Sequence, residues 1–210
     1  MSKLTLTIAL GMLAVGGLTV VGCGNGQDRS AKTASSSAMI SVDVTTAKQN
    51  LDQVVMGLKN LRDASDSADL KKLYDAVEDP TDELQDSLAD VAASSEKAVA
   101  AGKAQNEQWY KDAATFTDAG LRTASSKRQG DLRIAVDELA ASTASLRNVS
   151  DPYIAHVQQT LKAVDLDLSQ QGVAVIRPTV VKLVDDEAKL RDALTDVSSK
   201  GKALNTVINP

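Results

Sequence analysis

The chain has 210 residues, with 23 basic and 28 acidic side chains and a formal net charge of −5; 43 % of its residues are hydrophobic and 2 % are aromatic. An acidic chain with interspersed charges and no basic stripe argues against nucleic-acid binding and against docking on anionic lipid headgroups. The scarcity of aromatic residues argues against a thick globular core, because Phe, Tyr and Trp bury the largest areas. Thin seams of Ala, Leu and Val are instead typical of long helices that wrap around one another.

The N-terminal residues have the organisation of a bacterial lipoprotein signal peptide. Lys3 supplies the positive charge, residues 4–21 are apolar, and the sequence VVGC ending at Cys23 matches the lipobox, in which the cysteine is acylated and becomes the first residue. We therefore expect residues 1–22 to be removed and Cys23 to carry the lipid. An uncleaved membrane anchor and ordinary cleaved secretion are the alternatives. The apolar run, at about 18 residues, is at the short limit for a membrane span.

A lipid on Cys23 would hold the protein on a membrane, facing away from the cytoplasm. Because Gly24 is not the aspartate that retains many lipoproteins in the inner membrane, we expect the outer membrane, facing the periplasm, in a cell with two membranes. Residues 23–39 are small and polar and predict a flexible tether, followed by a helical domain over 40–210. Cys23 is the only cysteine, so no internal disulfide is available and the fold must depend on packing.

Two stripes of apolar residues follow the predicted tether, at alternating spacings of three and four that are typical of left-handed coiled coils. The first stripe covers 44–61, and either Asp66 or Ser67 is expected to cap the next helix. The second stripe covers 70–116 and keeps its phase across Asp79-Pro80. Since proline is tolerated in a first helical turn, we expect a kink or a restart there, with Asp79 as the N-cap.

Two further stripes complete the chain. The third covers 132–168, and Pro152 within it predicts a bend. The fourth covers 173–208, with Ser169 as its expected N-cap. Pro178 predicts a kink early in this last helix.

The four stripes predict an all-α fold, an elongated antiparallel bundle of three to four long helices with coiled-coil packing. The mature chain contains no alternating pattern typical of a strand. Short connections expected near 64–68, 117–131 and 169–172 would make sequential helices antiparallel. The alternative is a homo-oligomer, namely a parallel homodimer of extended coiled coils.

The second half of the chain contains a set of residues with a familiar order: Trp109-Tyr110, Arg122, Lys127-Arg128, Asp151-Pro152-Tyr153 and the segment 165–176. Through them the chain resembles an uncharacterised bacterial family of secreted proteins, defined only as a domain of unknown function and often lipoproteins with predicted coiled coils. The resemblance covers about 42–205, and Pro178 and the alanine-rich second stripe depart from the family pattern. It implies a helical rod and no catalytic residues.

The residues that could carry chemistry are few. His156 is the only histidine and has no cysteine or second histidine for a zinc site of the usual kind. The acidic groups at 165–167 and 185–187 lack the spacing of a calcium loop. Nucleophile, phosphate-binding and dinucleotide motifs are also missing. We therefore expect no metal, no cofactor and no catalytic residues.

One end of the predicted rod gathers the basic and aromatic residues. The basic residues are placed at the expected turn between the second and third stripes, and the aromatic ones nearby. A solvated turn and a widened seam are the simple interpretations, and contact with an anionic partner or lipid headgroup is the functional one. The candidate interaction patch consists of Arg122, Lys127, Arg128, Arg133, Trp109 and Tyr110.

These observations favour a lipid-anchored, non-enzymatic protein of the bacterial envelope that acts as a spacer or binds other envelope proteins. The first alternative is a ligand-binding or sensor bundle facing the periplasm, with a ligand between helices at the small residues from Ser95 to Gly102. An enzyme is the second alternative.

Overall fold

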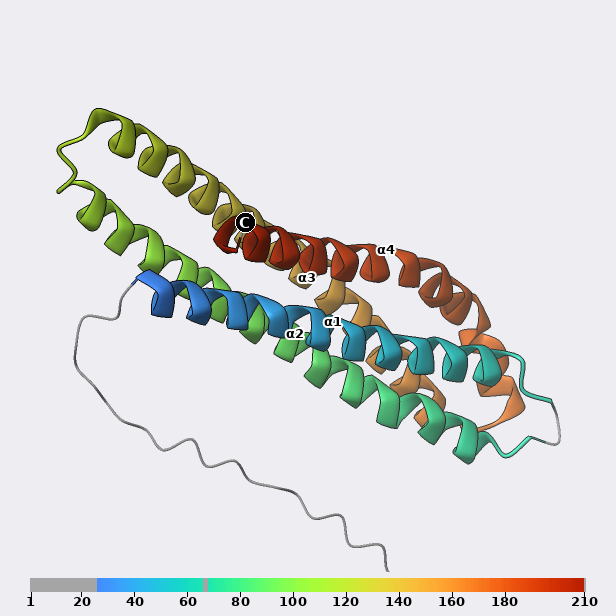
Figure 1. Ribbon diagram of the computed structural model, residues 1–210. Helices are drawn as coiled ribbons and strands as arrows, with labels where there is room; N and C mark the ends of the chain where they lie inside the picture. The colour runs from blue at the N-terminus through green and yellow to red at the C-terminus, as the bar shows by residue number, and fades with distance from the viewer. Residues whose placement is uncertain (1–25, 66–67, 210) are drawn as a thin grey trace, which may run out of the picture.

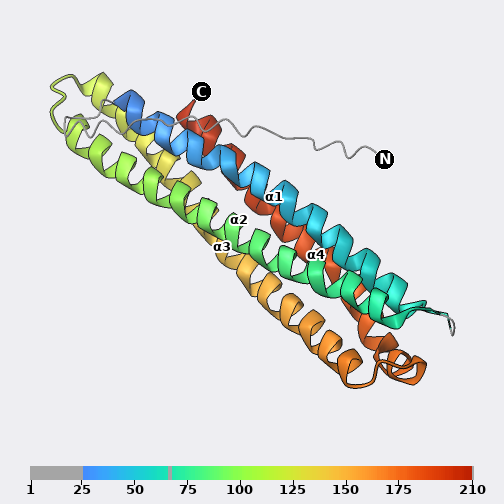
Figure 2. The ribbon, with the colours of Figure 1, turned by 90° about the horizontal axis from the view of Figure 1, so that it is seen from below.

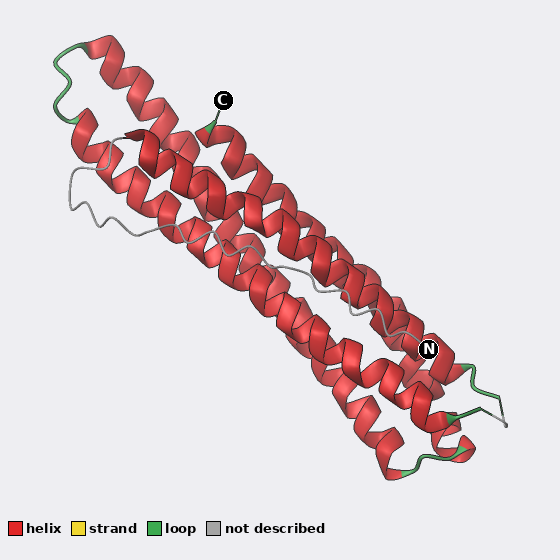
Figure 3. Ribbon diagram, turned by 60° about the horizontal axis from the view of Figure 1, so that its bottom comes forward, coloured by secondary structure: helices red, strands yellow, loops and turns green. Residues whose placement is uncertain are grey.

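The computed structural model describes residues 26–65 and 68–209, and these residues form a bundle of four helices without a strand (Figures 1 and 3). The prediction of an all-α fold is confirmed. The four helices are α1 (Gly26–Arg62), α2 (Leu70–Ala113), α3 (Ala119–Leu166) and α4 (Gln170–Ile208).

The helices run alternately up and down, and each packs against its neighbours in the chain, with α4 closing the ring on α1 (Figure 2). Helices across the diagonal hardly touch. The segments that join the helices are short, which makes sequential helices antiparallel. The chain therefore adopts the elongated antiparallel bundle rather than an extended coiled coil. With 48 residues, α3 alone is about 72 Å long at 1.5 Å per residue.

Each helix buries one stripe of apolar side chains, which together form the seam of the bundle. The predicted stripe positions of α1 and α4 are buried throughout, apart from the partly exposed Glu187. Burying one Leu or Val side chain contributes about 1.5–3 kcal/mol, so the seam holds the helices together. The fully buried leucines along it are Leu51, Leu58, Leu61, Leu84, Leu132, Leu139, Leu146, Leu190, Leu194 and Leu204.

Two predicted stripe residues lie outside the core. Phe116 is 37 % exposed and Leu168 is 39 % exposed. Both follow the end of a helix, since α2 ends at Ala113 and α3 at Leu166, and a loop residue no longer keeps the helical phase of the stripe.

The helix starts are set by short polar side chains. The Oδ1 of Asp69 accepts a hydrogen bond from the backbone N–H of Lys72 at the start of α2, so Asp69 is the cap there and the predicted cap at 66 or 67 is wrong. Asp118 caps α3 in the same way. Ser169 caps α4, as predicted.

The prediction of a tether over 23–39 is wrong for residues 26–39, which form the first turns of α1, while 23–25 lie outside the described residues. Thr33 and Ser37 are buried, and their hydroxyls donate to backbone carbonyls one turn back, at 3.1 Å and 2.8 Å. Their side chains therefore need no water. They continue the alternating spacing of three and four toward the N-terminus, and the helical domain begins well before residue 40.

Proline does not interrupt α2. The helix is continuous through Pro80, so the alternative of a restart with Asp79 as the N-cap is wrong. Proline has no N–H for the carbonyl four residues earlier, which here belongs to Ala76. That carbonyl oxygen faces Gly57 of α1 and would lie 2.4 Å from a Cβ placed there. Gly57 therefore lets α1 pack directly on the turn of α2 that proline alters.

We predict opposite effects for the same substitution at two helical glycines. Gly57→Ala should lower the free energy of unfolding by about 1–3 kcal/mol, because its Cβ would collide with the Ala76 carbonyl. Gly130→Ala in α3 should raise it by up to about 1 kcal/mol, because no atom lies within 4 Å of the added Cβ and alanine favours a helix. Urea denaturation measures both; equal effects at the two sites would contradict the close approach.

Tyr153 yields a prediction with a pH dependence. Its side chain is 4 % exposed, and its hydroxyl has no hydrogen-bond partner among the described residues. Tyr153→Phe should therefore raise the free energy of unfolding at pH 7 by up to about 1 kcal/mol. Burial raises the pKa of Tyr153 well above its ordinary value of 10.0. The folded state thus keeps a proton that the unfolded state loses, and stability falls as the pH rises above about 10. This fall should be smaller in Tyr153→Phe.

Tyr74→Phe is the matched control for this prediction. The Tyr74 hydroxyl donates to Glu78 Oε1 at 2.8 Å, and burial together with this bond raises its pKa to about 12. Removing that hydroxyl should lower stability at pH 7, opposite in sign to Tyr153→Phe. Denaturant titrations at pH 7 and pH 11 measure both, and a destabilised Tyr153→Phe at pH 7 would contradict the prediction.

Candidate binding pocket at the open end of the bundle

One end of the bundle is not closed by four helices. The α2–α3 hairpin extends past the start of α1 and the end of α4, as Figure 1 shows. Arg29, in the first turn of α1, pairs with Asp112 near the end of α2 at 2.9 Å. Ile208, the last residue of α4, lies beside Leu132, 13 residues after α3 begins. We call this region the open end.

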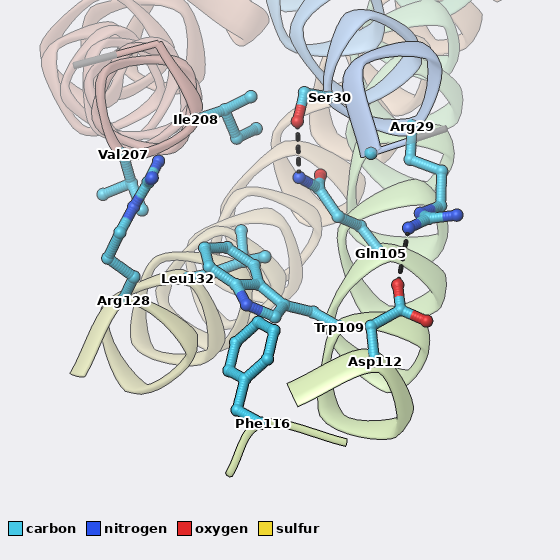
Figure 4. A pocket seen from close by; sticks show the side chains of 11 residues that line it. Arg29, Ser30, Gln105, Trp109, Asp112, Phe116, Arg128, Leu132, Val207 and Ile208 are labelled. Carbon is cyan, nitrogen blue, oxygen red and sulfur yellow. Dashed lines mark hydrogen bonds and ion pairs between the residues drawn. The ribbon is translucent and has the colours of Figure 1, made fainter. Parts of the chain in front are cut away.

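The open end contains a cavity of about 310 Å³ between the hairpin and the two shorter helices (Figure 4). Apolar side chains supply most of its inner wall, and two arginines and one aspartate lie around it. Its lining residues are Gly26, Arg29, Ser30, Gln105, Trp109, Asp112, Phe116, Arg128, Leu132, Val207 and Ile208.

Trp109, the only tryptophan of the chain, forms one wall of the cavity. Its indole Nε1 donates to Ser125 Oγ at 2.8 Å, which ties α2 to α3. The guanidinium of Arg128 lies over the ring, 5.2 Å from its centroid, at cation–π distance. The ring is therefore fixed at its Nε1 edge by Ser125 and on one face by Arg128, and it lines the cavity.

Gln105 carries an unusual polar group for a seam. It is 6 % exposed, its Nε2 donates to Ser30 Oγ at 2.9 Å, and its Oε1 is buried without a partner among the described residues. Ser30 Oγ contacts only one of the two polar atoms of the amide, so either orientation of the amide leaves the other atom unpaired. Such an atom costs about 1–3 kcal/mol. A bound molecule with a complementary polar group would remove this cost.

The charges at the cavity favour a ligand with an acidic group. Arg29 is paired with Asp112, whereas Arg128 has no carboxylate within ion-pair distance in the described part of the chain. The residues that line the cavity thus carry two guanidinium groups and one carboxylate. The arrangement suits an apolar or aromatic body with a polar or negatively charged group at one end.

The candidate patch predicted from the sequence is only partly assembled. Trp109 and Arg128 are in contact, Lys127 pairs with Asp131 at 2.7 Å, and Tyr110 is 68 % exposed. The connection predicted over 117–131 is wrong from 119 onward, because Asp118 caps α3 and the helix starts at Ala119. The basic residues therefore follow a helix rather than a turn.

The remaining two members lie elsewhere on α3. Arg122 and Arg133 are exposed and eleven residues apart, about three turns at 3.6 residues per turn, so they share one face of the helix. Arg128 instead faces Trp109. The six residues therefore do not form one surface.

The ligand position expected between Ser95 and Gly102 is filled. Ser95 and Ala98 are 0 % exposed, and a Cβ at Gly102 would lie 2.5 Å from Val136 Cγ2. The small residues thus bring α2 and α3 together instead of leaving space. The cavity lies about one to three turns beyond Gly102 along α2, where Gln105 and Trp109 interrupt the run of small side chains.

The other chemistry-bearing residues lie on helix surfaces. His156 is exposed, and Asp186 accepts a hydrogen bond from Lys189 Nζ at 2.7 Å, which lowers the pKa of that carboxyl. Glu187 pairs with Arg191. Within 26–65 and 68–209, no group of three or more His, Cys, Asp or Glu side chains is placed to hold a metal ion. None of the four described helices has the length and apolar character to cross a membrane.

The resemblance to an uncharacterised family of secreted bacterial proteins stays a prediction after comparison with known proteins. No family model, no curated protein and no solved structure matches the chain. Cys23, the predicted lipidation site, lies outside the described residues.

We predict that the buried amide of Gln105 lowers the stability of the bundle and that replacing it with an apolar side chain reverses this loss. Gln105→Leu should raise the free energy of unfolding by about 1 kcal/mol, because it removes a buried amide with an unpaired atom. Gln108→Leu, one turn along α2, is the control. Its amide donates to Asp112 Oδ1 at 2.8 Å on the surface, so no gain is expected. Thermal and urea denaturation of both variants would test this, and a destabilised Gln105→Leu would contradict it.

Proposed function

We propose that this chain is a lipid-anchored, non-enzymatic protein of the bacterial envelope, in which the four-helix rod acts as a spacer or binds other envelope proteins. The observation that carries the proposal is the position of the rod in the sequence. Its first helix starts at Gly26, three residues after the lipobox cysteine Cys23. A lipid on Cys23 would thus hold one end of a rigid rod on the outer membrane, facing the periplasm.

The far end of the rod offers the surface for a partner. The α1–α2 and α3–α4 loops lie together there, about 70 Å along the bundle axis from the open end by the length of α3. Gln170 Nε2 donates to the Ser65 carbonyl at 2.5 Å and Arg177 Nε donates to the Arg62 carbonyl at 3.1 Å, which fixes the start of α4 to the end of α1 and to the residues that follow it. Leu166 is 81 % exposed and Leu168 is 39 % exposed beside them, and these neighbouring apolar side chains are the contact that we propose for a partner.

The proposal predicts both lipidation and a partner. In a bacterial host, the wild-type chain should incorporate labelled palmitate and sediment with membranes, and Cys23→Ala should do neither. A photo-crosslinking residue at Leu166 should capture specific proteins from cells that carry the lipidated form, and one at Ala144, exposed near the middle of α3, should not. Absence of label on the wild-type chain would refute the anchor. Identical adducts at both positions would refute the distal contact.

A second candidate function, a ligand-binding bundle, is favoured by the cavity with the unpaired Gln105 atom. The ligand class is an apolar or aromatic acid, for the charge reasons given above. The aromatic sulfonate anilinonaphthalene sulfonate is a suitable probe, and Trp109 provides an intrinsic fluorescence donor in the cavity wall.

This candidate predicts that filling the cavity abolishes binding. The probe should quench Trp109 emission, and Val207→Phe at the cavity wall should remove that effect. Val181→Phe, at a position on α4 that is 44 % exposed, should leave it unchanged. Equal probe binding by the two variants would exclude the cavity as the site.

A further inference from the structure

The open end of the bundle is also the end at which the chain enters it. Ser30 of α1 is hydrogen-bonded to Gln105 of α2, and Gly26 and Trp109 each lie four residues beyond this pair toward the open end, so α1 starts at the level of Trp109. The link from Cys23 to Gly26 is three residues long and spans at most about 11 Å when fully extended. Any anchor on Cys23 is therefore close to the α2–α3 hairpin.

The hairpin extends beyond the start of α1 by a distance comparable to the span from Cys23 to Gly26. Trp109 is level with Ser125, to which it is hydrogen-bonded, and α3 begins six residues before Ser125, at Ala119. Six residues at 1.5 Å each extend about 9 Å beyond that level. A lipid on Cys23 and the end of the hairpin would thus reach the same membrane surface.

We infer that the hairpin tip, residues 110–122, is a second membrane contact that rests in the headgroup region of the bilayer next to the lipid on Cys23. This inference rests on the proposed lipid anchor. It replaces the picture of a rod on a long flexible tether with a rod held at its base by two neighbouring points.

The side chains of the hairpin tip suit the boundary between headgroups and acyl chains. Tyr110 is 68 % exposed, Phe116 is 37 % exposed and Leu121 is 59 % exposed. Side chains of these three types are usually buried when they lie on the inner face of a helix. With Trp109, the region holds three of the five aromatic residues of the protein. Aromatic rings with one polar edge concentrate at membrane interfaces, where one side is apolar and the other wet.

The charge at the hairpin differs from that of the chain as a whole. Between 110 and 128 there are four basic residues and two acidic ones, whereas the whole chain has 23 basic and 28 acidic residues. Arg122 is exposed and makes no ion pair within the described residues. Anionic lipid attracts such a local excess of basic side chains even when the protein is acidic overall. The charges along the rest of the rod would keep it off the surface.

The experiment separates this contact from lipidation in cells. The chain from Cys23 onward, which contains all the described helices, is coupled through its only thiol to a maleimide lipid with a short spacer. The vesicles contain phosphatidylcholine and phosphatidylglycerol, with or without bromine atoms on the acyl chains, which quench nearby tryptophan. Two single-tryptophan variants report on the two ends of the rod: Trp109→Phe with Phe116→Trp at the hairpin tip, and Trp109→Phe with Leu166→Trp at the far end.

The tip variant should show a blue shift on coupling and a loss of emission in brominated vesicles, and the far-end variant should show neither. Equal emission of the tip variant in brominated and unbrominated vesicles would overturn the inference. Palmitate labelling of Cys23 in cells tests the anchor separately. Quenching at the tip without cellular labelling would therefore refute the proposed function and leave the membrane affinity of the hairpin established.

Amide hydrogen exchange of the unsubstituted chain provides a second measurement if a variant fails to fold. Coupling to the vesicles should slow exchange in 114–118 and leave exchange in 167–169 unchanged. Equal exchange in 114–118 before and after coupling would overturn the inference.

Discussion

Three glycines set how closely the helices of this bundle approach one another. A Cβ at Gly57 would lie 2.4 Å from the Ala76 carbonyl oxygen of α2, one at Gly102 would lie 2.5 Å from Val136 of α3, and one at Gly201 would lie 3.2 Å from Ile40 of α1. These positions join α1 to α2, α2 to α3 and α4 to α1. A seam this narrow has room for Ala, Val and Leu and little room for aromatic rings, which explains the composition of the chain.

The same narrow seam accounts for the position of the largest side chains. Tryptophan fits where the bundle widens, and it widens where α1 begins, α4 ends and the hairpin continues alone. Trp109 closes the seam there, with Arg128 on its face and Ser125 at its Nε1. The cavity, the half-satisfied Gln105 and the aromatic hairpin tip thus have one cause, the unequal lengths of the four helices.

The fold could be predicted because the alternating spacing of apolar residues is a property of each helix by itself. The first turns of α1 escaped prediction because Thr33 and Ser37 are typical of flexible segments, yet in a helix their hydroxyls bond to carbonyls one turn back. The pocket escaped for another reason. Whether Gln105 meets a partner or a cavity depends on where α1 begins and α4 ends, two points 182 residues apart in the sequence. Its polar side chain at a seam position was the only local signal.

The hydroxyl-lined start of α1 also determines how the bundle would respond to mechanical load. Its first fourteen residues bury only Thr33 and Ser37, so they contribute little hydrophobic free energy and open more readily than the leucine-rich turns after Ile40. A pull on the chain from its N-terminal side meets these turns first. They would unwind before the core is disturbed, and each unwound residue gains about 2 Å of reach over its helical rise. The rod thus carries an extensible segment at its base, held in helical form when no force acts on it.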